Sequence, residues 1–330
     1  MQKTVFSGIQ PSGNLHLGNY LGAIRNWVTL QEEFNSIFCV VDLHAITAPQ
    51  DPKQLKEKII EVAKIYLSAG IDPKNSVIFV QSQIPQHTEL MWILNTITKT
   101  GELYKMTQFK DKSGTSETKE NLLSVDAGLL NYPILMAADI LLYDTHLVPV
   151  GEDQLQHIEL TRTLARRFND RFGETFIVPE PYVLKKGMRI MGLDDPAKKM
   201  SKSAQSKYNH IELLDSPDEI REKIKKAVTD SGSTIEYSDE HPAIKNLLNI
   251  LSLITNTHPE KIARNFEGKG YKEFKEDLAE SIIEFLSPFQ KKYHETSDAE
   301  VLMQLKNGKE KLLPITEKKI KEVKEKVGFI

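Results

Sequence analysis

The segment from Phe6 to Tyr20 places a histidine, an asparagine and several glycines in one turn, FSGIQPSGNLHLGNY. An apolar run predicts a buried strand ending at Ile9, and a helix is predicted to begin near Gly18. Free N–H groups at that helix start would lie at the carboxyl edge of a parallel sheet, where anions bind. Glycine alone is ordinary in a turn, but the His16 imidazole and the Asn19 carboxamide beside it can contact a polyphosphate. The sequence contains neither a P-loop nor a GxGxxG fingerprint.

A second segment, KKMSKS at Lys198 to Ser203, holds two lysines three residues apart in a short polar loop. Mobile ammonium groups at Lys199 and Lys202, together with the serine hydroxyls, can surround a pyrophosphate leaving group. Such a cluster by itself is usually a solvated loop. Its position near the end of the α/β half of the chain, in order with the first segment, favours a phosphate site.

Both segments need a parallel sheet to position them, and the first half of the chain predicts one. Short β-branched runs alternate with longer amphipathic runs, which is typical of a doubly wound, Rossmann-like α/β domain. Strands are expected at Thr4–Ile9, Ser36–Asp42, Ser76–Val80 and His146–Val150. Helices are expected at Gly18–Glu33, after Asp51 and Pro52, and at His87–Thr100, Leu129–Tyr143 and Glu152–Phe168. The polar run Ser113–Asp126 predicts a loop directly after Lys112.

Beyond Asn209 the sequence predicts an all-helical second domain, because its apolar residues repeat at helical spacing. The expected helices are Ser216–Thr229, Pro242–Thr255, Pro259–Phe266, Tyr271–Tyr293, Ser297–Asn307 and Thr316–Val327. We therefore expect a catalytic domain over 1–188 with a helical insertion at about 87–143, a linker loop over 189–208, and a helical domain over 209–330. The tail Leu305–Ile330 carries eight lysines against four glutamates, which fits either a solvated face or an RNA-binding patch.

The overall composition excludes several classes of protein. The 330 residues are 40% hydrophobic and 27% charged, which excludes a disordered or collagen-like chain. A formal net charge of −3 provides no global basic field for nucleic acid. No apolar run approaches the roughly 20 residues that span a bilayer, and no signal peptide is visible. The single cysteine, Cys39, precludes an internal disulfide and a cysteine-based zinc site. We therefore expect a cytoplasmic protein without membrane or DNA partners.

Six segments can be compared with known families: FSGIQPSG (Phe6–Gly13), HLGN (His16–Asn19), DLHAIT (Asp42–Thr47), YPILMAADILLY (Tyr132–Tyr143), VPVGEDQLQHIELTR (Val148–Arg162) and KMSKS (Lys199–Ser203). HLGN and KMSKS resemble the paired signature motifs of class I aminoacyl-tRNA synthetases. Taken in order, the six segments resemble the bacterial-type tryptophanyl-tRNA synthetases across two-thirds of the chain. After about Tyr293 only a helical tail is carried over.

The resemblance implies a reaction in two steps. ATP and L-tryptophan would form tryptophanyl adenylate and pyrophosphate, and tryptophan would then pass to the terminal ribose of tRNA(Trp). Magnesium would accompany ATP, and no zinc or organic cofactor is expected. Because the substrate carboxylate attacks the α-phosphorus, the work of the protein is positioning and charge stabilisation. The resemblance also implies that the helical domain reads the anticodon and that the helical insertion forms a homodimer.

By resemblance, one set of residues borders ATP. In chain order the set is Gln10, Pro11, Ser12, His16, Gly18, Asn19, Gly151, Glu152, Asp153, Ile190, Lys199, Met200, Ser201, Lys202 and Ser203. Gly151–Asp153 would lie at the ribose and Ile190 near the adenine. Lys199 and Lys202 would hold the developing pyrophosphate, and Lys112 would assist them.

Recognition of tryptophan needs one buried acceptor for the indole N–H and apolar walls for the ring. By resemblance Asp139 is the acceptor, and the sulfur of Met136 lies against the ring. The other implied contacts are Phe6, Ile140, Val148 and Val150 as walls, His44 lining the pocket, and Tyr132 and Gln154 near the α-amino group. Without the resemblance, a helix cap or a salt bridge is the more common role for an aspartate such as Asp139, and ordinary core is the more common role for a methionine such as Met136.

Some departures and alternatives remain open. Asn19 replaces the second histidine of the usual HIGH motif, and the loop Ser113–Asp126 is longer than in the shortest family members. Asp42 and His44 do not complete a zinc ligand set, so core or pocket roles are expected. A tyrosyl-tRNA synthetase shares the fold and the reaction, and Asp139 could also meet a phenol. A small-molecule nucleotidyltransferase would not need the helical domain, and a non-catalytic paralogue would not need intact signature lysines.

Overall fold

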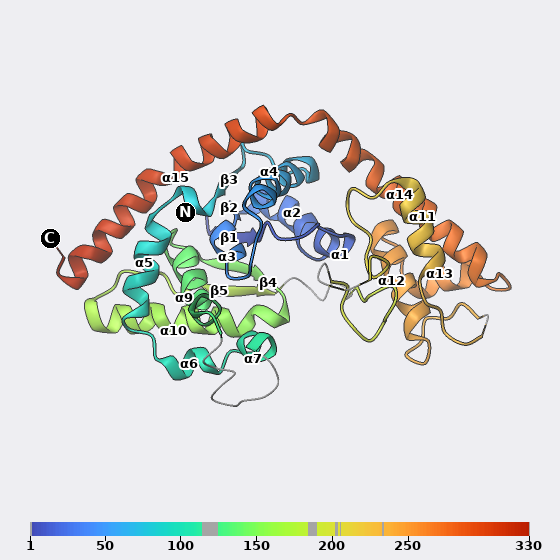
Figure 1. Cartoon of the computed structure of the whole chain (residues 1–330), viewed down its shortest axis with the longest axis horizontal. Coiled ribbons are helices and arrows are strands. Elements are labelled where there is room, and N and C mark those ends of the chain that lie inside the picture. The colour runs from blue at the N-terminus through green and yellow to red at the C-terminus, as the bar shows by residue number, and fades with distance from the viewer. Residues whose placement is uncertain are drawn as a thin grey trace.

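The computed structural model describes residues 2–113, 125–183, 190–201, 204, 206–232 and 234–329. An α/β domain built around one sheet lies beside a helical domain, and a long carboxyl-terminal helix runs along the outside of the molecule (Figure 1). Most of the predicted loop Ser113–Asp126 falls outside the described residues. Within the described ranges, no helix is long and apolar enough to cross a membrane.

Five strands of the described chain form one parallel sheet in the order β3-β2-β1-β4-β5. Their bounds are β1 Thr4–Ile9, β2 Asn35–Val40, β3 Ser76–Val80, β4 Leu147–Val150 and β5 Glu180–Val183. β2 pairs with one side of β1, and β3 pairs with β2. The chain then crosses back, and β4 pairs with the other side of β1. The predicted doubly wound α/β fold is therefore confirmed. The strand order reverses between β1 and β4, and ligands of such sheets bind at the carboxyl ends of the strands there.

The strand β5 was not predicted from the sequence. It reads EPYV, and glutamate and proline are both uncommon inside a sheet. Proline is tolerated on an edge strand, because only one side of an edge strand has to supply hydrogen bonds. Among the described strands β5 pairs only with β4, so it is such an edge.

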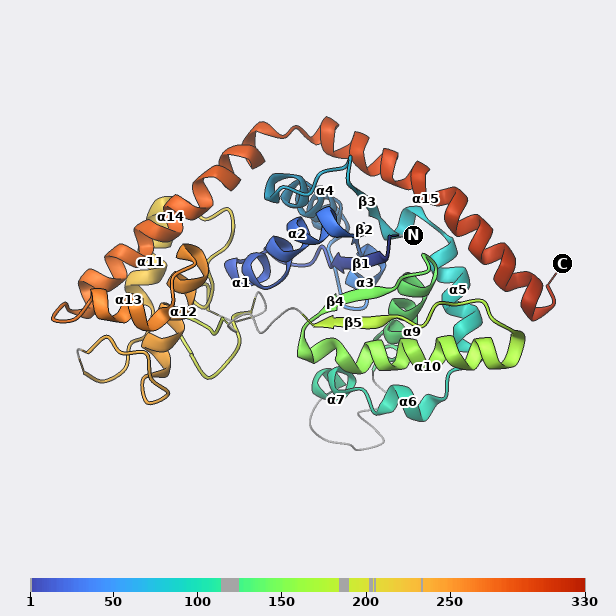
Figure 2. The same ribbon diagram turned by 180° about the vertical axis from the view of Figure 1, so that it is seen from behind.

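Side chains of the sheet alternate between two faces, and each face has its own helices. Phe38 points to the face covered by α2 (Arg25–Glu33) and α4 (Pro52–Ala69), where the Trp27 ring stacks on it at 5.0 Å. The next residue along β2, Cys39, points to the other face. That face is covered by α5 (Gln86–Asn95), α9 (Ala127–Leu141) and α10 (Leu155–Phe172), which lie together on one side of the sheet in Figure 2.

Local sequence signals explain several helix boundaries and fail at one. Asp51 caps α4 as predicted, because its carboxylate accepts from the N–H groups of Lys53 and Gln54 at 3.0 and 2.9 Å. The predicted helix Gly18–Glu33 is wrong as one regular helix. A short helix, α1 (Leu17–Asn19), and a π-helical turn over Tyr20–Ile24 precede α2. A π-turn changes the residue spacing locally, and such turns occur frequently at functional sites. The remaining short helices are α3 Asp42–Ala45, α6 Thr100–Tyr104 and α7 Thr107–Ser113.

The second domain is helical, as predicted. Its helices are α11 Pro217–Lys226, α12 Pro242–Thr255, α13 Pro259–Asn265 and α14 Tyr271–Glu295, followed by α15 Asp298–Val327. The prediction of two separate helices over Ser297–Asn307 and Thr316–Val327 is wrong. They form the single helix α15, which continues through Pro314. Tertiary packing supports most helices in proteins and here outweighs the local cost of the proline.

Helix α15 packs along the outer edge of the sheet, against β3 and α4 (Figures 1 and 2). Gly308 allows this close approach: a Cβ atom there would lie 2.8 Å from the carbonyl carbon of Ile78 and closer still to its oxygen. Further along, Lys311 Nζ donates to the Pro73 carbonyl at 3.1 Å, and Lys324 pairs with Glu89 of α5 at 2.7 Å. The second half of α15 therefore rests on the α/β domain.

Candidate active site

A cavity of about 330 Å³ opens at the carboxyl ends of β1 and β4, where the strand order reverses. All nine residues predicted to bind tryptophan line it: Phe6, His44, Tyr132, Met136, Asp139, Ile140, Val148, Val150 and Gln154. Two predicted ATP-binding residues, Gln10 and Gly151, line it as well. The structure thus brings together side chains from β1, α3, α9 and β4 that are far apart in the sequence.

The carboxylate of Asp139 is buried at the cavity wall, with 1% of the residue exposed. In the described part of the chain, three side chains hold it. His44 Nε2 lies 2.8 Å from Oδ2, and His87 Nδ1 lies 2.7 Å from Oδ1. Gln81 Nε2 donates to both oxygens at 2.7 and 2.9 Å. Since only His44 and Asp139 of this group line the cavity, Gln81 and His87 hold the carboxylate from behind.

Two opposing effects set the pKa of Asp139. Burial alone raises the pKa of this carboxyl, because the charged form loses its hydration. Hydrogen bonds from His44 and His87, and the charges of both rings, outweigh burial and hold the pKa well below the usual range. Asp139 is therefore ionised at neutral pH, and its oxygens only accept hydrogen bonds.

Tyr132 lines the cavity from α9, and polar groups surround its hydroxyl. The hydroxyl donates to Gln108 Oε1 at 3.1 Å and lies 2.8 Å from His157 Nε2. Burial raises the pKa of Tyr132 to about 12, so the hydroxyl keeps its proton. Gln108 also lines the cavity, but it was not predicted. It lies in α7 within an ordinary polar sequence, which gave no signal for a binding role.

The first signature segment forms a turn whose backbone is fixed from two sides. Asn19 Oδ1 accepts from the N–H of His16 at 3.1 Å, which closes the turn on itself. The N–H of Leu17 donates to the carbonyl of Ile211 at 2.8 Å, so residues after the second signature segment also hold the turn. His16 is buried, and its ring lies 5.6 Å from that of His210.

The second signature segment lies directly against the first. Met200 is buried, and its N–H donates to the carbonyl of Ile190 at 3.2 Å. A Cβ atom added to Gly18 would lie 3.0 Å from the His16 ring and 3.5 Å from the Met200 sulfur. The Met200 sulfur therefore lies in contact range of Gly18, so the two signature segments are neighbours. Ser201 is fixed through its N–H, which donates to Asn209 Oδ1 at 3.0 Å.

The remaining residues predicted for ATP binding and pyrophosphate stabilisation fall into four groups. Pro11, Ser12 and Lys199 continue the two signature segments, and Lys199 is exposed. Glu152 and Asp153 are exposed in the turn that precedes α10. Ile190 lies in the core with Met200 and is not among the described residues that line the cavity. Lys202 and Ser203 lie outside the described residues, as does the side chain of Lys112 in α7.

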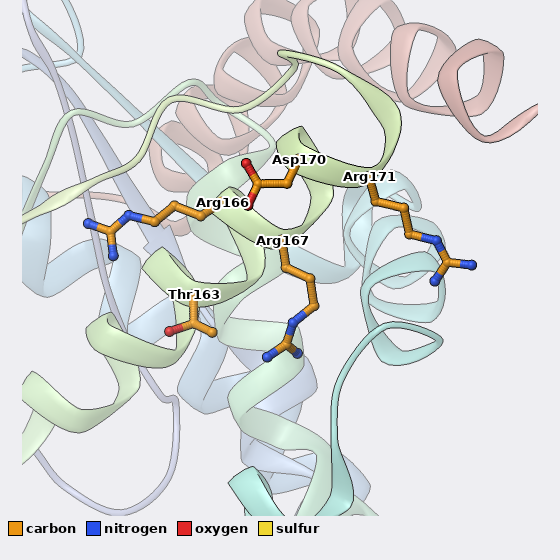
Figure 3. A pocket seen from close by; sticks show the side chains of 5 residues that line it. All are labelled: Thr163, Arg166, Arg167, Asp170 and Arg171. Atoms are coloured by element: carbon orange, nitrogen blue, oxygen red, sulfur yellow. The ribbon is translucent and has the colours of Figure 1, made fainter.

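A second hollow, of about 540 Å³, lies on the outer face of α10, away from the residues predicted from the sequence. It is lined by Thr163, Arg166, Arg167, Asp170 and Arg171. Figure 3 shows the three arginines fanning out from the helix in different directions. Arg167 is held by Glu102 of α6 at 2.5 Å and donates to the Ile97 carbonyl at 2.7 Å. This hollow is an open basic surface and not an enclosed binding site.

Comparison with known proteins agrees with this geometry. Residues 2–287 match the family described as tRNA synthetases class I (W and Y). A tryptophan–tRNA ligase of Caldanaerobacter subterraneus subsp. tengcongensis is 54% identical over 99% of this chain and 99% of its own length. The crystal structure of a tryptophanyl-tRNA synthetase from Mycoplasma pneumoniae has a TM-score of 0.91 at 34% identity, covering 100% of this chain and 99% of that chain. That of a Campylobacter jejuni tryptophanyl-tRNA synthetase, complexed with ADP and tryptophan, has a TM-score of 0.84 at 35% identity, covering 99% and 100%.

The parallel sheet, the cavity at its reversal point and the two facing signature segments define a class I aminoacyl-tRNA synthetase. This class includes enzymes for both tryptophan and tyrosine. The full-length similarity then decides between these two branches: the chain belongs to the bacterial-type tryptophanyl-tRNA synthetases. The resemblance of the six sequence segments is thereby confirmed.

Proposed function

We propose that the chain activates L-tryptophan with ATP at this cavity and then transfers tryptophan to tRNA(Trp). The observation that carries this proposal is Asp139, a buried and ionised acceptor in the wall of a cavity of about 330 Å³. An indole ring has a large apolar surface and a single N–H, so one acceptor among apolar walls suits it. The family to which the chain belongs supports the same substrate.

Within the cavity, the indole N–H donates to Asp139 and the ring lies among Phe6, Met136, Ile140, Val148 and Val150. His44 lines the pocket beside the carboxylate, 2.8 Å from Oδ2. Tyr132 and Gln154 also line the cavity, and the N–H of Gln154 donates to the Gly151 carbonyl at 3.0 Å. They bind the α-amino group of the substrate, which leaves its carboxylate directed toward ATP.

ATP binds across the two signature segments, with Gln10, Pro11, Ser12, His16, Gly18, Asn19, Gly151, Glu152, Asp153, Ile190, Met200, Ser201 and Ser203 around it. The substrate carboxylate attacks the α-phosphorus, the bond to the β-phosphate oxygen breaks, and pyrophosphate leaves. Lys199 and Lys202 stabilise the charge that grows on pyrophosphate, and Lys112 assists them. Magnesium enters as part of the ATP substrate, and the chain needs neither zinc nor an organic cofactor. We place the reaction in the cytoplasm.

In the second step, a hydroxyl of the terminal ribose of tRNA(Trp) attacks the carbonyl carbon of the adenylate, and AMP leaves. The helical domain reads the anticodon. Neither DNA nor a membrane takes part.

The chain acts as a homodimer that forms through the helical insertion. Large apolar side chains of this region face solvent in the single chain: Trp92 of α5 is 66% exposed and Tyr104 of α6 is 45% exposed. Exposed aromatic side chains of this size are typical of protein interfaces. Sedimentation at micromolar concentration should show a species of twice 37.5 kDa, and a single 37.5 kDa species would exclude this dimer.

The decisive experiment is ATP–pyrophosphate exchange with purified protein, magnesium and either tryptophan or tyrosine, in the absence of tRNA. Exchange that depends on tryptophan supports both the adenylation chemistry and the indole pocket. Exchange driven by tyrosine would keep the fold and the mechanism but reject the assignment of Asp139. No exchange with either amino acid would make a non-catalytic paralogue the better description.

A further inference from the structure

Behind Asp139, a chain of buried polar groups leads away from the cavity. His87 Nδ1 lies 2.7 Å from Asp139 Oδ1, and His87 Nε2 lies 2.8 Å from the hydroxyl of Tyr143. His87 is 0% exposed and Tyr143 is 4% exposed. Neither is among the described residues that line the cavity, so direct contact with the substrate does not explain them.

The protonation of Asp139 and Tyr143, the two outer members of this hydrogen-bonded series, determines how its hydrogen bonds run. Ionised Asp139 can only accept, so His87 Nδ1 must carry a proton and donate it. Burial raises the pKa of Tyr143 well above its ordinary value, so its hydroxyl keeps its proton and can donate. The Tyr143 hydroxyl lies 2.8 Å from Nε2, on the opposite side of the His87 ring from Asp139. Tyr143 therefore helps to hold the ring with Nδ1 directed at the Asp139 carboxylate.

Ring packing holds the same residues in place. Phe79 stacks on His87 with centroids 5.8 Å apart and the rings inclined by only 18°. Phe6 stacks on Tyr143 at 5.5 Å and 12°, and Phe6 also lines the cavity. Asp139 lies in the last turn of α9, and Tyr143 lies in the turn that directly follows this helix. The chain of hydrogen bonds is thus fixed to the cavity wall as well as to the carboxylate.

We propose that His87, oriented by Tyr143, is a positioning residue that fixes the Asp139 carboxylate as the acceptor for the indole N–H. It thereby sets the selectivity of the site for a ring that carries an N–H at that point. This inference rests on the proposed function. A merely structural role for His87 would satisfy the same buried groups but would not affect the choice between two substrates of equal shape.

The test compares tryptophan with 3-(benzothiophen-3-yl)alanine, in which sulfur replaces the indole N–H. The ratio of kcat/KM for the two substrates in ATP–pyrophosphate exchange measures the contribution of the N–H. For His87→Leu we expect this ratio to fall about tenfold or more, because a hydrogen bond to a charged group contributes that much discrimination. His87→Asn keeps an N–H near the position of Nδ1 and should retain most of the ratio. Tyr143→Phe, which loses only the hydroxyl, should lower the ratio by about threefold.

Thr145→Val provides the matched control. Thr145 is fully buried just beyond Tyr143, and its Oγ1 has no hydrogen-bond partner within the described residues. Replacing it removes a buried hydroxyl from the same region without touching the chain from Tyr143 to Asp139. The substrate ratio of Thr145→Val should equal that of the unmodified protein.

The outcomes separate the inference from the function on which it rests. Equal losses with both substrates in His87→Leu would show a structural role and overturn the inference. An unmodified protein that uses both substrates equally well would also overturn it, because no N–H contact would then exist. No exchange with tryptophan at all would reject the proposed function itself. If His87→Leu does not fold, Tyr143→Phe decides alone: a lowered ratio supports the inference and an unchanged ratio overturns it.

Discussion

Replacing Gly308 by alanine tests how α15 is attached to the α/β domain. The added Cβ would lie 2.8 Å from the carbonyl carbon of Ile78 and 3.3 Å from Val77 Cγ1. The nearest atoms belong to the backbone of β3, which cannot rotate away as a side chain could. The helix must therefore move off the strand by roughly 1 Å to reach an ordinary carbon–carbon separation.

The size of the effect follows from what this displacement disturbs. Leu305 and Leu312 flank Gly308 on the same face of α15 and are 2% and 1% exposed. A gap of up to about 1 Å removes a quarter to a half of the contact energy of such side chains, about 1 to 2 kcal/mol for the two together. Overpacking adds about 1 to 3 kcal/mol, and the better helix propensity of alanine offsets up to about 1 kcal/mol. We expect a net loss in the free energy of unfolding on the order of 2 to 3 kcal/mol.

Urea denaturation followed by circular dichroism measures this loss. Gly101→Ala is the matched control, since an added Cβ there meets no atom within 4 Å and the residue also lies in a helix. It should leave the protein unchanged or stabilise it by up to about 1 kcal/mol. If Gly308→Ala unfolds at the same urea concentration as Gly101→Ala, the close packing of α15 on β3 does not exist in solution.

Three further predictions concern the site. Asp139→Asn should raise the KM for tryptophan by about tenfold and leave the KM for ATP nearly unchanged, because a neutral amide oxygen replaces the charged acceptor of the indole N–H; equal increases for both substrates would exclude a direct contact with the indole. The lowered pKa of Asp139 also predicts how the free energy of unfolding depends on pH. Its ionised form stabilises the fold above the pKa of about 3.9 in the unfolded chain, and this contribution is lost as the pH falls through the lower folded value. The difference in unfolding free energy between the unmodified protein and Asp139→Asn should therefore shrink from about pH 4 downward, and a difference that is constant over this range would contradict the assigned shift. Lys199→Ala should lower kcat for pyrophosphate exchange more than it raises the KM for ATP, because the charge it meets grows in the transition state; an unchanged kcat in rapid-quench measurements would remove Lys199 from the mechanism.

The parts of the fold that the sequence predicts are those with a strong local pattern. The strands Thr4–Ile9 and Ser76–Val80 and the helix Pro242–Thr255 have the predicted bounds, because each is an apolar run or an amphipathic repeat with clear ends. The strand Glu180–Val183 has no such pattern, and only its pairing with β4 makes it a strand. The helix Asp298–Val327 continues through Pro314 because it packs on β3. The local sequence pattern does not predict this packing.

Some residues of the site could be predicted from the sequence, and others are found only in the folded structure. The resemblance of the six segments identified nine candidate tryptophan-binding residues that all line the cavity, including Asp139 and Met136. It did not identify Gln81, His87 or Tyr143, which meet Asp139 directly or through one another only in the folded chain. Each of these three side chains lies in a segment whose sequence is ordinary for a helix or a turn. Their role depends on distances between residues that are far apart in the sequence, and a single sequence does not predict these distances.

The helical domain is joined to the α/β domain at two points of the chain, one after β5 and one near Ser297, where α14 ends and α15 begins its run along the sheet edge. Both termini therefore lie with the α/β domain (Figure 2). Met191 of the second signature region is bound to Asn246 of α12 by two hydrogen bonds of 2.8 and 3.0 Å. Leu17 of the first signature segment donates to the Ile211 carbonyl at 2.8 Å, and Arg25 of α2 donates to the Leu253 carbonyl of α12 at 2.6 Å. The proposed nucleotide site therefore lies at the junction of the two domains, and its shape depends on how they are joined.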